Sequence, residues 1–217
     1  MTTILEIIER LSFLAAMPAV AGLFIALALL LVMERWQMHA LGMAILYFFA
    51  ALLHTRVIHP EVAAIKLLIG WMIALTLYLT GRRLSEQQEA GEEESSEPTR
   101  PPFSMAAGTP LRALILIAVF VIAQASSIRF PLPEVPADVG LACYLLGTGG
   151  LFLMGLSEDP FRAGLGLLTF LAGFDLLFGV LEPSLVVAGL LGAAGFLIAL
   201  GVTFLAVTHA AQEGNQP

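Results

Sequence analysis

Two ionisable side chains lie inside long apolar segments of this sequence, where a charge is costly. Lys66 lies within Val62–Thr80, and Asp175 lies within Ala163–Leu181. A charge inside a membrane-spanning helix costs at least about 2.5–3.5 kcal/mol, and such residues often mark proton pathways. An ion pair would remove most of this cost, and a carboxyl group near the edge could exchange a proton with water. Lys66 and Asp175 are therefore the candidate proton-relay residues.

The positions of the two residues in their segments allow them to meet. Lys66 follows Val62 by four residues, which is about 6 Å along a helix, and Asp175 precedes Leu181 by six residues, or about 9 Å. Both depths are measured from the same membrane face, so the residues meet if the third and sixth spans are neighbours. In the alternative interpretation, Lys66 snorkels to the headgroups. Asp175 would then be a neutral carboxylic acid or make a helix–helix hydrogen bond.

No other residue set predicts a catalytic site, a metal site or a cofactor. His54, His59 and Glu61 cluster between the second and third spans, but their spacing matches no familiar metal motif. The single cysteine, Cys143, is expected to be a small packing residue, since it has no partner for a disulfide or an iron–sulfur ligand set. Motifs for phosphate binding, acyl transfer and zinc hydrolysis are missing from the sequence.

The composition predicts that most of the chain is in contact with lipid. Of its 217 residues, 59% are hydrophobic and 12% are charged. Ordinary soluble domains are about 45–50% apolar and about 25% charged. The net charge of −7 and the missing basic patch also argue against a nucleic-acid partner. We therefore predict an all-α, polytopic transmembrane helix bundle, because a helix satisfies its own backbone amides in lipid.

Apolar runs of about 18–24 residues predict seven spans in a three-plus-four arrangement. They are Leu11–Met33, Trp36–Leu53, Val62–Thr80, Leu111–Ile128, Val139–Leu156, Ala163–Leu181 and Ser184–Val207. Gly147, Gly149 and Gly150 interrupt the fifth, so a re-entrant or kinked element is an alternative there. Small residues four apart predict close helix packing in the seventh span, and Gly164, Gly166 and Gly173 do so in the sixth. The pairs in the seventh span are Ala188 with Gly192, Gly189 with Ala193, and Gly195 with Ala199.

The chain divides at a polar segment. Residues 1–83 form an N-terminal three-helix membrane segment, and residues 110–217 form a C-terminal four-helix segment. Residues 84–109 carry six glutamates and no apolar periodicity, which predicts a disordered acidic loop. This loop is either a solvated linker or a binding tail for a basic partner. Glu6, Glu9 and Arg10 precede the first apolar run in place of the basic cluster of a signal peptide, so this run is expected to be retained.

Arginines in the connections predict the orientation in the membrane. With seven spans, the N-terminal side holds three of them and the other side holds six. The two sets are Arg10, Arg56 and Arg129, and Arg35, Arg82, Arg83, Arg100, Arg112 and Arg162. The N-terminus is therefore expected outside, and the acidic loop and C-terminus in the cytoplasm, in a bacterial or archaeal cell membrane. Trp36 and Tyr78 fit an aromatic belt at the interface.

The last three predicted helices resemble a known family. The pattern is Tyr144–Gly147 and Leu153–Leu156, a short polar connection Ser157–Arg162, a glycine-rich span, a turn at Glu182-Pro183, and a Gly/Ala-rich span ending Thr203–Val207. It resembles the small K-type membrane subunit of NADH-quinone oxidoreductase, and still more its longer relative, the E-type membrane subunit of group-four, formate-hydrogenlyase-type hydrogenases. Val62–Leu68 of this chain is similar to the lysine-bearing helix of that relative. Basic residues follow that helix in the relative, as Arg82-Arg83 follow it in this chain. The resemblance covers Trp36 onward, without the acidic loop.

The sequence departs from this family where the family's proton-transfer glutamates stand. The first glutamate aligns with Thr169, and Gly195 lies near the second. The connection Glu158-Asp159 is acidic where the family is basic. By the resemblance, Lys66 carries over by position and the two glutamates do not. A proton path through this chain is therefore in question even within the family, and a structural spacer is the alternative.

The resemblance implies a non-catalytic membrane subunit of a hydrogenase or NADH-quinone-oxidoreductase-type complex. It would be structural, with possible help to proton translocation through Lys66 and Asp175. Its partners would be the lipid bilayer, antiporter-like membrane subunits and peripheral redox subunits, which would hold the catalytic centres and all cofactors. The alternatives are a stand-alone small transporter or channel, and a membrane scaffold protein.

Overall fold

The computed structural model is a bundle of α-helices. It describes residues 17–33, 35–94, 104–133, 135–157, 159–182 and 184–213, with the backbone alone at residue 60 and over 86–94, 104–109 and 210–213. Over these residues every regular element is helical. The helices are α2 (Met17–Val32), α3 (Trp36–His54), α4 (Pro60–Glu94), α5 (Ser104–Arg129), α6 (Ala137–Gly155), α7 (Pro160–Leu181) and α8 (Leu185–Glu213).

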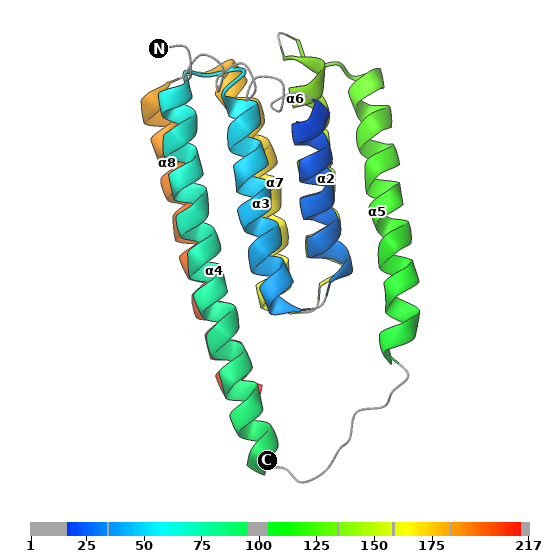
Figure 1. Cartoon of the computed structure of the whole chain (residues 1–217), viewed down its shortest axis with the longest axis vertical. Coiled ribbons are helices and arrows are strands. Elements are labelled where there is room, and N and C mark those ends of the chain that lie inside the picture. The colour runs from blue at the N-terminus through cyan, green and yellow to red at the C-terminus, as the bar shows by residue number, and fades with distance from the viewer. Residues whose placement is uncertain are drawn as a thin grey trace, which may run out of the picture.

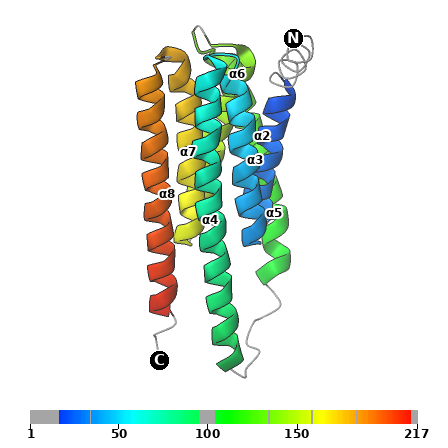
Figure 2. The same cartoon turned by 60° about the vertical axis from the view of Figure 1, so that its left-hand side comes forward.

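Consecutive helices run in opposite directions along the bundle (Figure 1). Helices α3, α4, α8 and α7 form a closed ring, in which each helix contacts the next. Helices α2 and α6 pack against α3 and α7 respectively, and α5 lies at the outside against α2 and α6 (Figure 2). Up-and-down order follows from the short connections, since a turn of a few residues can only join antiparallel neighbours.

Six of the described helices have the length and apolarity to cross a membrane. Their apolar segments are Trp36–His54, Glu61–Ser85, Pro110–Arg129, Ala137–Gly155, Pro160–Leu181 and Leu185–His209. Each coincides within a few residues with a predicted span. The described part of the first predicted span is the 16-residue apolar helix α2, and its N-terminal part lies outside the described residues.

Two expectations about local structure need correction. Helix α6 is continuous through Gly147, Gly149 and Gly150, so the fifth span is a helix and the re-entrant alternative is wrong. The acidic loop predicted over 84–109 is shorter than expected, because α4 continues to Glu94 and α5 begins at Ser104. Glutamate, glutamine and alanine are good helix formers, so the composition that excludes a packed core still extends an existing helix. The remaining part of that loop lies outside the described residues.

Glycines let α6 and α7 approach closely. A Cβ atom on Gly150 would lie 2.5 Å from the backbone nitrogen of Phe170, and one on Gly166 would lie 2.6 Å from that of Met154. Gly173 faces the same helix, since its Cβ would lie 3.1 Å from the nitrogen of Gly147. The prediction of close packing by small residues in the sixth span is therefore confirmed.

Replacing Gly150 with alanine is expected to destabilise the protein by about 1–3 kcal/mol, because the new methyl group would overlap backbone atoms of α7 that cannot rotate away. The matched control is Gly147→Ala on the same helix, where an added Cβ meets no described atom within 4 Å. The measurement is the unfolding midpoint in detergent. Equal midpoints for the two variants would contradict the close α6–α7 contact.

Candidate functional site

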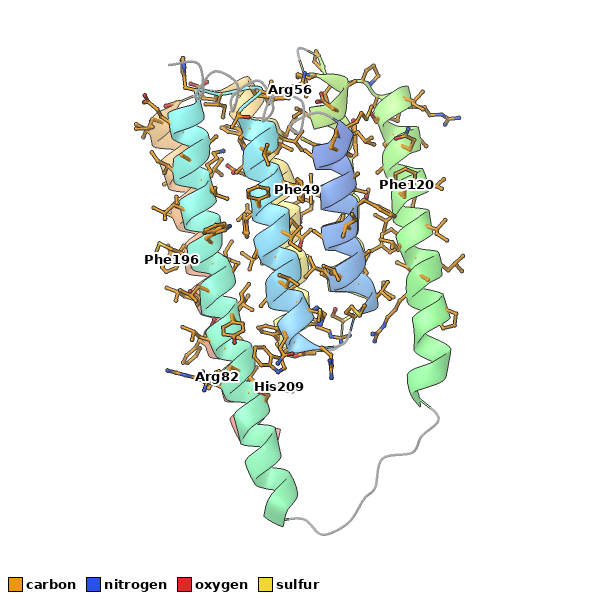
Figure 3. The ribbon with its side chains drawn as sticks, viewed as in Figure 1. Phe49, Arg56, Arg82, Phe120, Phe196 and His209 are labelled. Atoms are coloured by element: carbon orange, nitrogen blue, oxygen red, sulfur yellow. The ribbon has the colours of Figure 1, made fainter. Side chains whose placement is uncertain are left out.

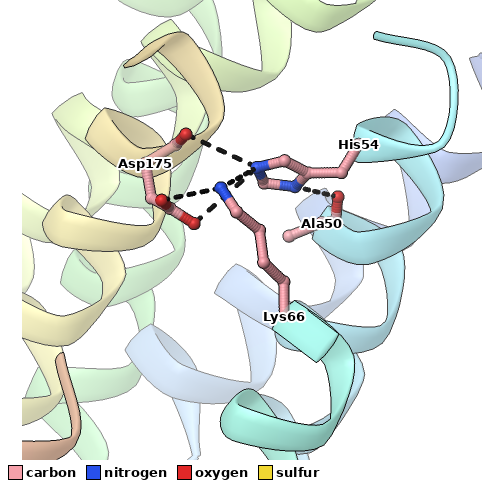
Figure 4. A network of polar contacts seen from close by, with 4 residues as sticks. All are labelled: Ala50, His54, Lys66 and Asp175. Carbon is pink, nitrogen blue, oxygen red and sulfur yellow. Dashed lines mark hydrogen bonds and ion pairs between the residues drawn. The ribbon is translucent and has the colours of Figure 1, made fainter. Parts of the chain in front are cut away.

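Three side chains from three helices meet in the ring of α3, α4, α7 and α8. The ammonium Nζ of Lys66 in α4 donates a hydrogen bond of 2.8 Å to Oδ1 of Asp175 in α7. The same Nζ lies 2.9 Å from Nε2 of His54, the last residue of α3. The second carboxylate oxygen of Asp175, Oδ2, lies 3.7 Å from Nε2. Figure 4 shows the three groups pointing toward one another.

The hydrogen bonds assign the tautomer of His54. Its Nδ1 lies 2.8 Å from the carbonyl oxygen of Ala50, which can only accept a hydrogen bond, so Nδ1 carries a proton. In the neutral ring, Nε2 is then an acceptor, and it takes its hydrogen bond from the Lys66 ammonium group. The backbone carbonyl oxygen of Asp175 lies 3.4 Å from Nε2 and can only accept a hydrogen bond. While Nε2 carries no proton, this contact is at most weak.

The charges of the cluster balance within an apolar surrounding. The side chains of Lys66 and His54 are 7% and 4% exposed, and that of Asp175 is 22% exposed. A buried ion pair is tolerated when the remaining donors and acceptors also find partners. The neutral His54 ring provides this second partner for the ammonium group, so one positive and one negative charge share a satisfied network.

A small cavity adjoins the cluster. Its volume is about 40 Å³, and a single water molecule needs about 10–15 Å³ of such space. The lining side chains come from all four helices of the ring: Tyr47, Ala50, Ala51 and His54 of α3, Lys66, Ile69, Gly70 and Ile73 of α4, Leu171, Ala172 and Asp175 of α7, and Leu191, Gly192 and Gly195 of α8. The site therefore has room for water beside its ionisable groups.

Glycines shape this site. The Tyr47 ring lies over Gly70, where a Cβ would be 2.5 Å from Cγ of the tyrosine. One turn beyond Asp175, Gly179 faces His54, and an added Cβ would be 3.4 Å from Nε2. Gly195 of α8, whose spacing predicts helix packing, also lines the cavity. These residues keep space for the polar groups in a bundle that is otherwise filled by large apolar side chains.

The structure brings the two predicted residues together. Both lie six residues, or about 9 Å, from the helix ends Pro60 and Leu181 at the same end of the bundle. The prediction that they could meet is confirmed, and the snorkelling alternative for Lys66 is wrong, because its Nζ turns into the bundle. Helices α4 and α7 are both neighbours of α3 and α8, and the Lys66 side chain reaches across the space between them.

Two polar residues at this end of the bundle are not predicted from the sequence. The chain order groups His54 with His59 and Glu61, yet His54 shares a helix face with Ala50 and Tyr47, which the 3.6-residue period could have indicated. Asp138, in the first turn of α6, forms a 2.6 Å ion pair with Arg56. Within the described part of the chain, no three histidine, cysteine, aspartate or glutamate side chains are grouped as a metal site requires.

Neither family models nor curated proteins nor solved structures provide a match to this chain. The fold and composition by themselves define the class. Its helices are long and apolar enough to cross a bilayer, and apolar side chains cover their outer faces. The protein is an all-α integral membrane protein that contacts the lipid bilayer.

Proposed function

We propose that this chain is a non-catalytic membrane subunit of an energy-converting oxidoreductase complex, of the hydrogenase or NADH-quinone oxidoreductase type, and that the cluster of Lys66, His54 and Asp175 assists proton transfer. The observation that carries this proposal is the lysine ammonium group held between a carboxylate and an imidazole beside a cavity large enough for water. Ionisable groups at membrane depth commonly serve as proton relays.

The geometry supports a proton transfer step that needs no change in net charge. A proton can pass from Nζ of Lys66 to the lone pair of Nε2 of His54 along their 2.9 Å contact. The products are a neutral amine and an imidazolium, and the carboxylate of Asp175 lies 3.7 Å from the new charge. Because the cluster holds one positive and one negative charge before and after this step, the step adds no uncompensated charge to the low-dielectric surrounding.

The family resemblance supports the subunit role. By the resemblance, Lys66 stands where the hydrogenase subunit carries its lysine, while the first glutamate of the family aligns with Thr169 and Gly195 lies near the second. Thr169 is fully buried and its hydroxyl donates to the carbonyl oxygen of Leu165, 2.8 Å away, so it acts as a packed polar residue there. Asp175 is the acidic group of α7, and it lines one cavity with Gly195.

The outer helix α5 leaves an apolar face open to lipid or to other subunits. In the most apolar stretch of α5, only 11% of the residues are buried.

The described arginines are unequally distributed between the two ends of the bundle. Five lie at the end where α3 begins, and two lie at the opposite end. The five are Arg35, Arg82, Arg83, Arg112 and Arg162, and the two are Arg56 and Arg129. By the positive-inside rule, the richer end faces the cytoplasm. We propose seven spans, with the N-terminus outside and the C-terminus in the cytoplasm.

Co-purification tests the subunit role. The tagged protein, extracted from its native membrane in a mild detergent, is expected to bring along antiporter-like membrane subunits and redox subunits with iron–sulfur or nickel–iron centres. Mass spectrometry identifies them, and an unrelated polytopic protein with the same tag is the control. Recovery of the chain alone, as a homogeneous particle, would contradict the subunit role and favour a stand-alone transporter, which ion flux in liposomes would then detect.

A further inference from the structure

A second cavity lies on the lipid-facing side of α3 and α4, away from the polar cluster. It is an open groove of about 590 Å³ lined by Gln37, Ala40, Leu41, Ala44, Leu68, Trp71, Met72, Ala74, Leu75 and Tyr78. Its walls are large apolar side chains that remain exposed, such as Leu68 at 63% and Trp71 at 54%. Exposed grooves of this size are the usual form of a ligand site.

The sequence of the two helices explains why a groove forms here. Two aromatic rings hold α3 against α4, with Tyr47 over Gly70 at one level and Trp36 over Gly81 at another. Between these levels alanines line the bottom of the groove, and the larger side chains beside them form its walls. The floor of the groove is formed by Ala40, Ala44 and Ala74, of which Ala40 and Ala74 are 6% exposed.

The position and polarity of the groove match a lipid whose headgroup lies at the end of the bundle where α3 begins. Leu68 lies fifteen residues from Arg83, or about 22 Å along α4. On α4 the apolar lining runs from Leu68, about 10 Å beyond Glu61, to Tyr78, and on α3 it ends at Gln37, where Trp36 lies beside Tyr78 at a ring distance of 5.3 Å. Such aromatic pairs typically lie at headgroup depth.

Positive charge lies at the headgroup end of the groove. Arg83 follows Met72 by eleven residues, three helical turns, so it continues the groove face of α4, and it is exposed. Arg35 is exposed in the connection just before α3, and Figure 3 shows Arg82, the neighbour of Arg83, near the level at which α3 begins. Basic residues at membrane–water interfaces attract anionic headgroups.

We propose that the groove between α3 and α4 binds an anionic phospholipid, with an acyl chain along Leu75 and Trp71 and its phosphate near Arg35 and Arg83. This inference is independent of the proposed oxidoreductase role. It assigns to this face a lipid ligand of the leaflet at the C-terminal end of α4.

The two tryptophans of the chain provide a local test. The Trp36→Phe variant of the full chain, in phosphatidylcholine vesicles, retains Trp71 in the groove as the reporter. Phosphatidylglycerol with brominated acyl chains is expected to quench Trp71 at a mole fraction about 25-fold lower than brominated phosphatidylcholine does, since each of the two basic residues near the phosphate contributes a factor of about five. Equal quenching by the two lipids, or no quenching by either, would overturn the proposal.

Two further variants locate the site. Arg35→Gln combined with Arg83→Gln is expected to abolish the preference for phosphatidylglycerol, while Arg112→Gln on α5 retains it. Ala44→Phe fills the floor and should reduce Trp71 quenching by phosphatidylglycerol severalfold, and Val121→Phe on the exposed face of α5 should not. If Ala44→Phe fails to fold, the arginine variants still decide. A preference unchanged by the arginine pair, or lost with Arg112→Gln, overturns the proposal.

Discussion

Replacing Asp175 with asparagine is expected to lower the free energy of unfolding by about 3–5 kcal/mol, because removal of one partner leaves the other charge buried and uncompensated. The Lys66 side chain is 7% exposed, and its other contact is the neutral ring of His54, which cannot balance the charge. The measurement is a denaturant titration of the purified protein in detergent, which yields the free energy of unfolding for each variant.

A double variant and a second ion pair make this prediction specific. Lys66→Met combined with Asp175→Leu removes both charges and is expected to recover stability to within about 1 kcal/mol of the unmodified protein. Asp138→Asn is the control, with an expected loss of at most about 1 kcal/mol, since the side chain of its partner Arg56 is 37% exposed. A double variant as unstable as Asp175→Asn would show that the ion pair is not the source of the loss.

The helix pattern is predictable from the sequence because lipid imposes a simple rule. Every amide in hydrocarbon must be bonded within its own segment, so apolar length alone predicts a helix. Where this rule stops applying, the prediction loses accuracy. Residues 84–94 are polar and their composition predicts a loop, yet α4 continues through them. Helix propensity, which acts on polar and apolar residues alike, outweighs the missing apolar periodicity there.

The candidate site is predictable only in part. Charges in apolar segments are rare enough that Lys66 and Asp175 stand out, and their similar depth suggests contact. His54 is not distinguished from other interfacial histidines by its sequence position, because a histidine at a span end is common. The sequence also does not show which helix it faces. Its place in the cluster depends on the packing of α3 against α7, through Gly179, which is a tertiary property. The groove between α3 and α4 likewise depends on how two aromatic rings meet two glycines.

Replacing Lys66 with arginine is expected to abolish most proton movement through this protein while leaving it folded. Arginine keeps the positive charge and can pair with Asp175, but its guanidinium group does not release a proton in proteins. The adjoining cavity of about 40 Å³ offers space for part of the larger head group. Because a positioned proton-transfer group contributes about 10²–10⁴-fold to its step, the rate of coupled proton transfer should fall by roughly a hundredfold.

The readout is proton uptake into sealed membrane vesicles, driven by the electron donor of the complex and divided by the electron-transfer rate in the same sample. A structural role and a relay role then give different patterns. If the cluster only holds helices together, Lys66→Arg and the charge-free double variant of Lys66 and Asp175 retain proton uptake in proportion to their stability. If it relays protons, both variants assemble and lose proton uptake, whereas Asp138→Asn keeps it, since that ion pair lies outside the cluster. Normal proton uptake by a stable Lys66→Arg variant would therefore reduce the cluster to a structural ion pair.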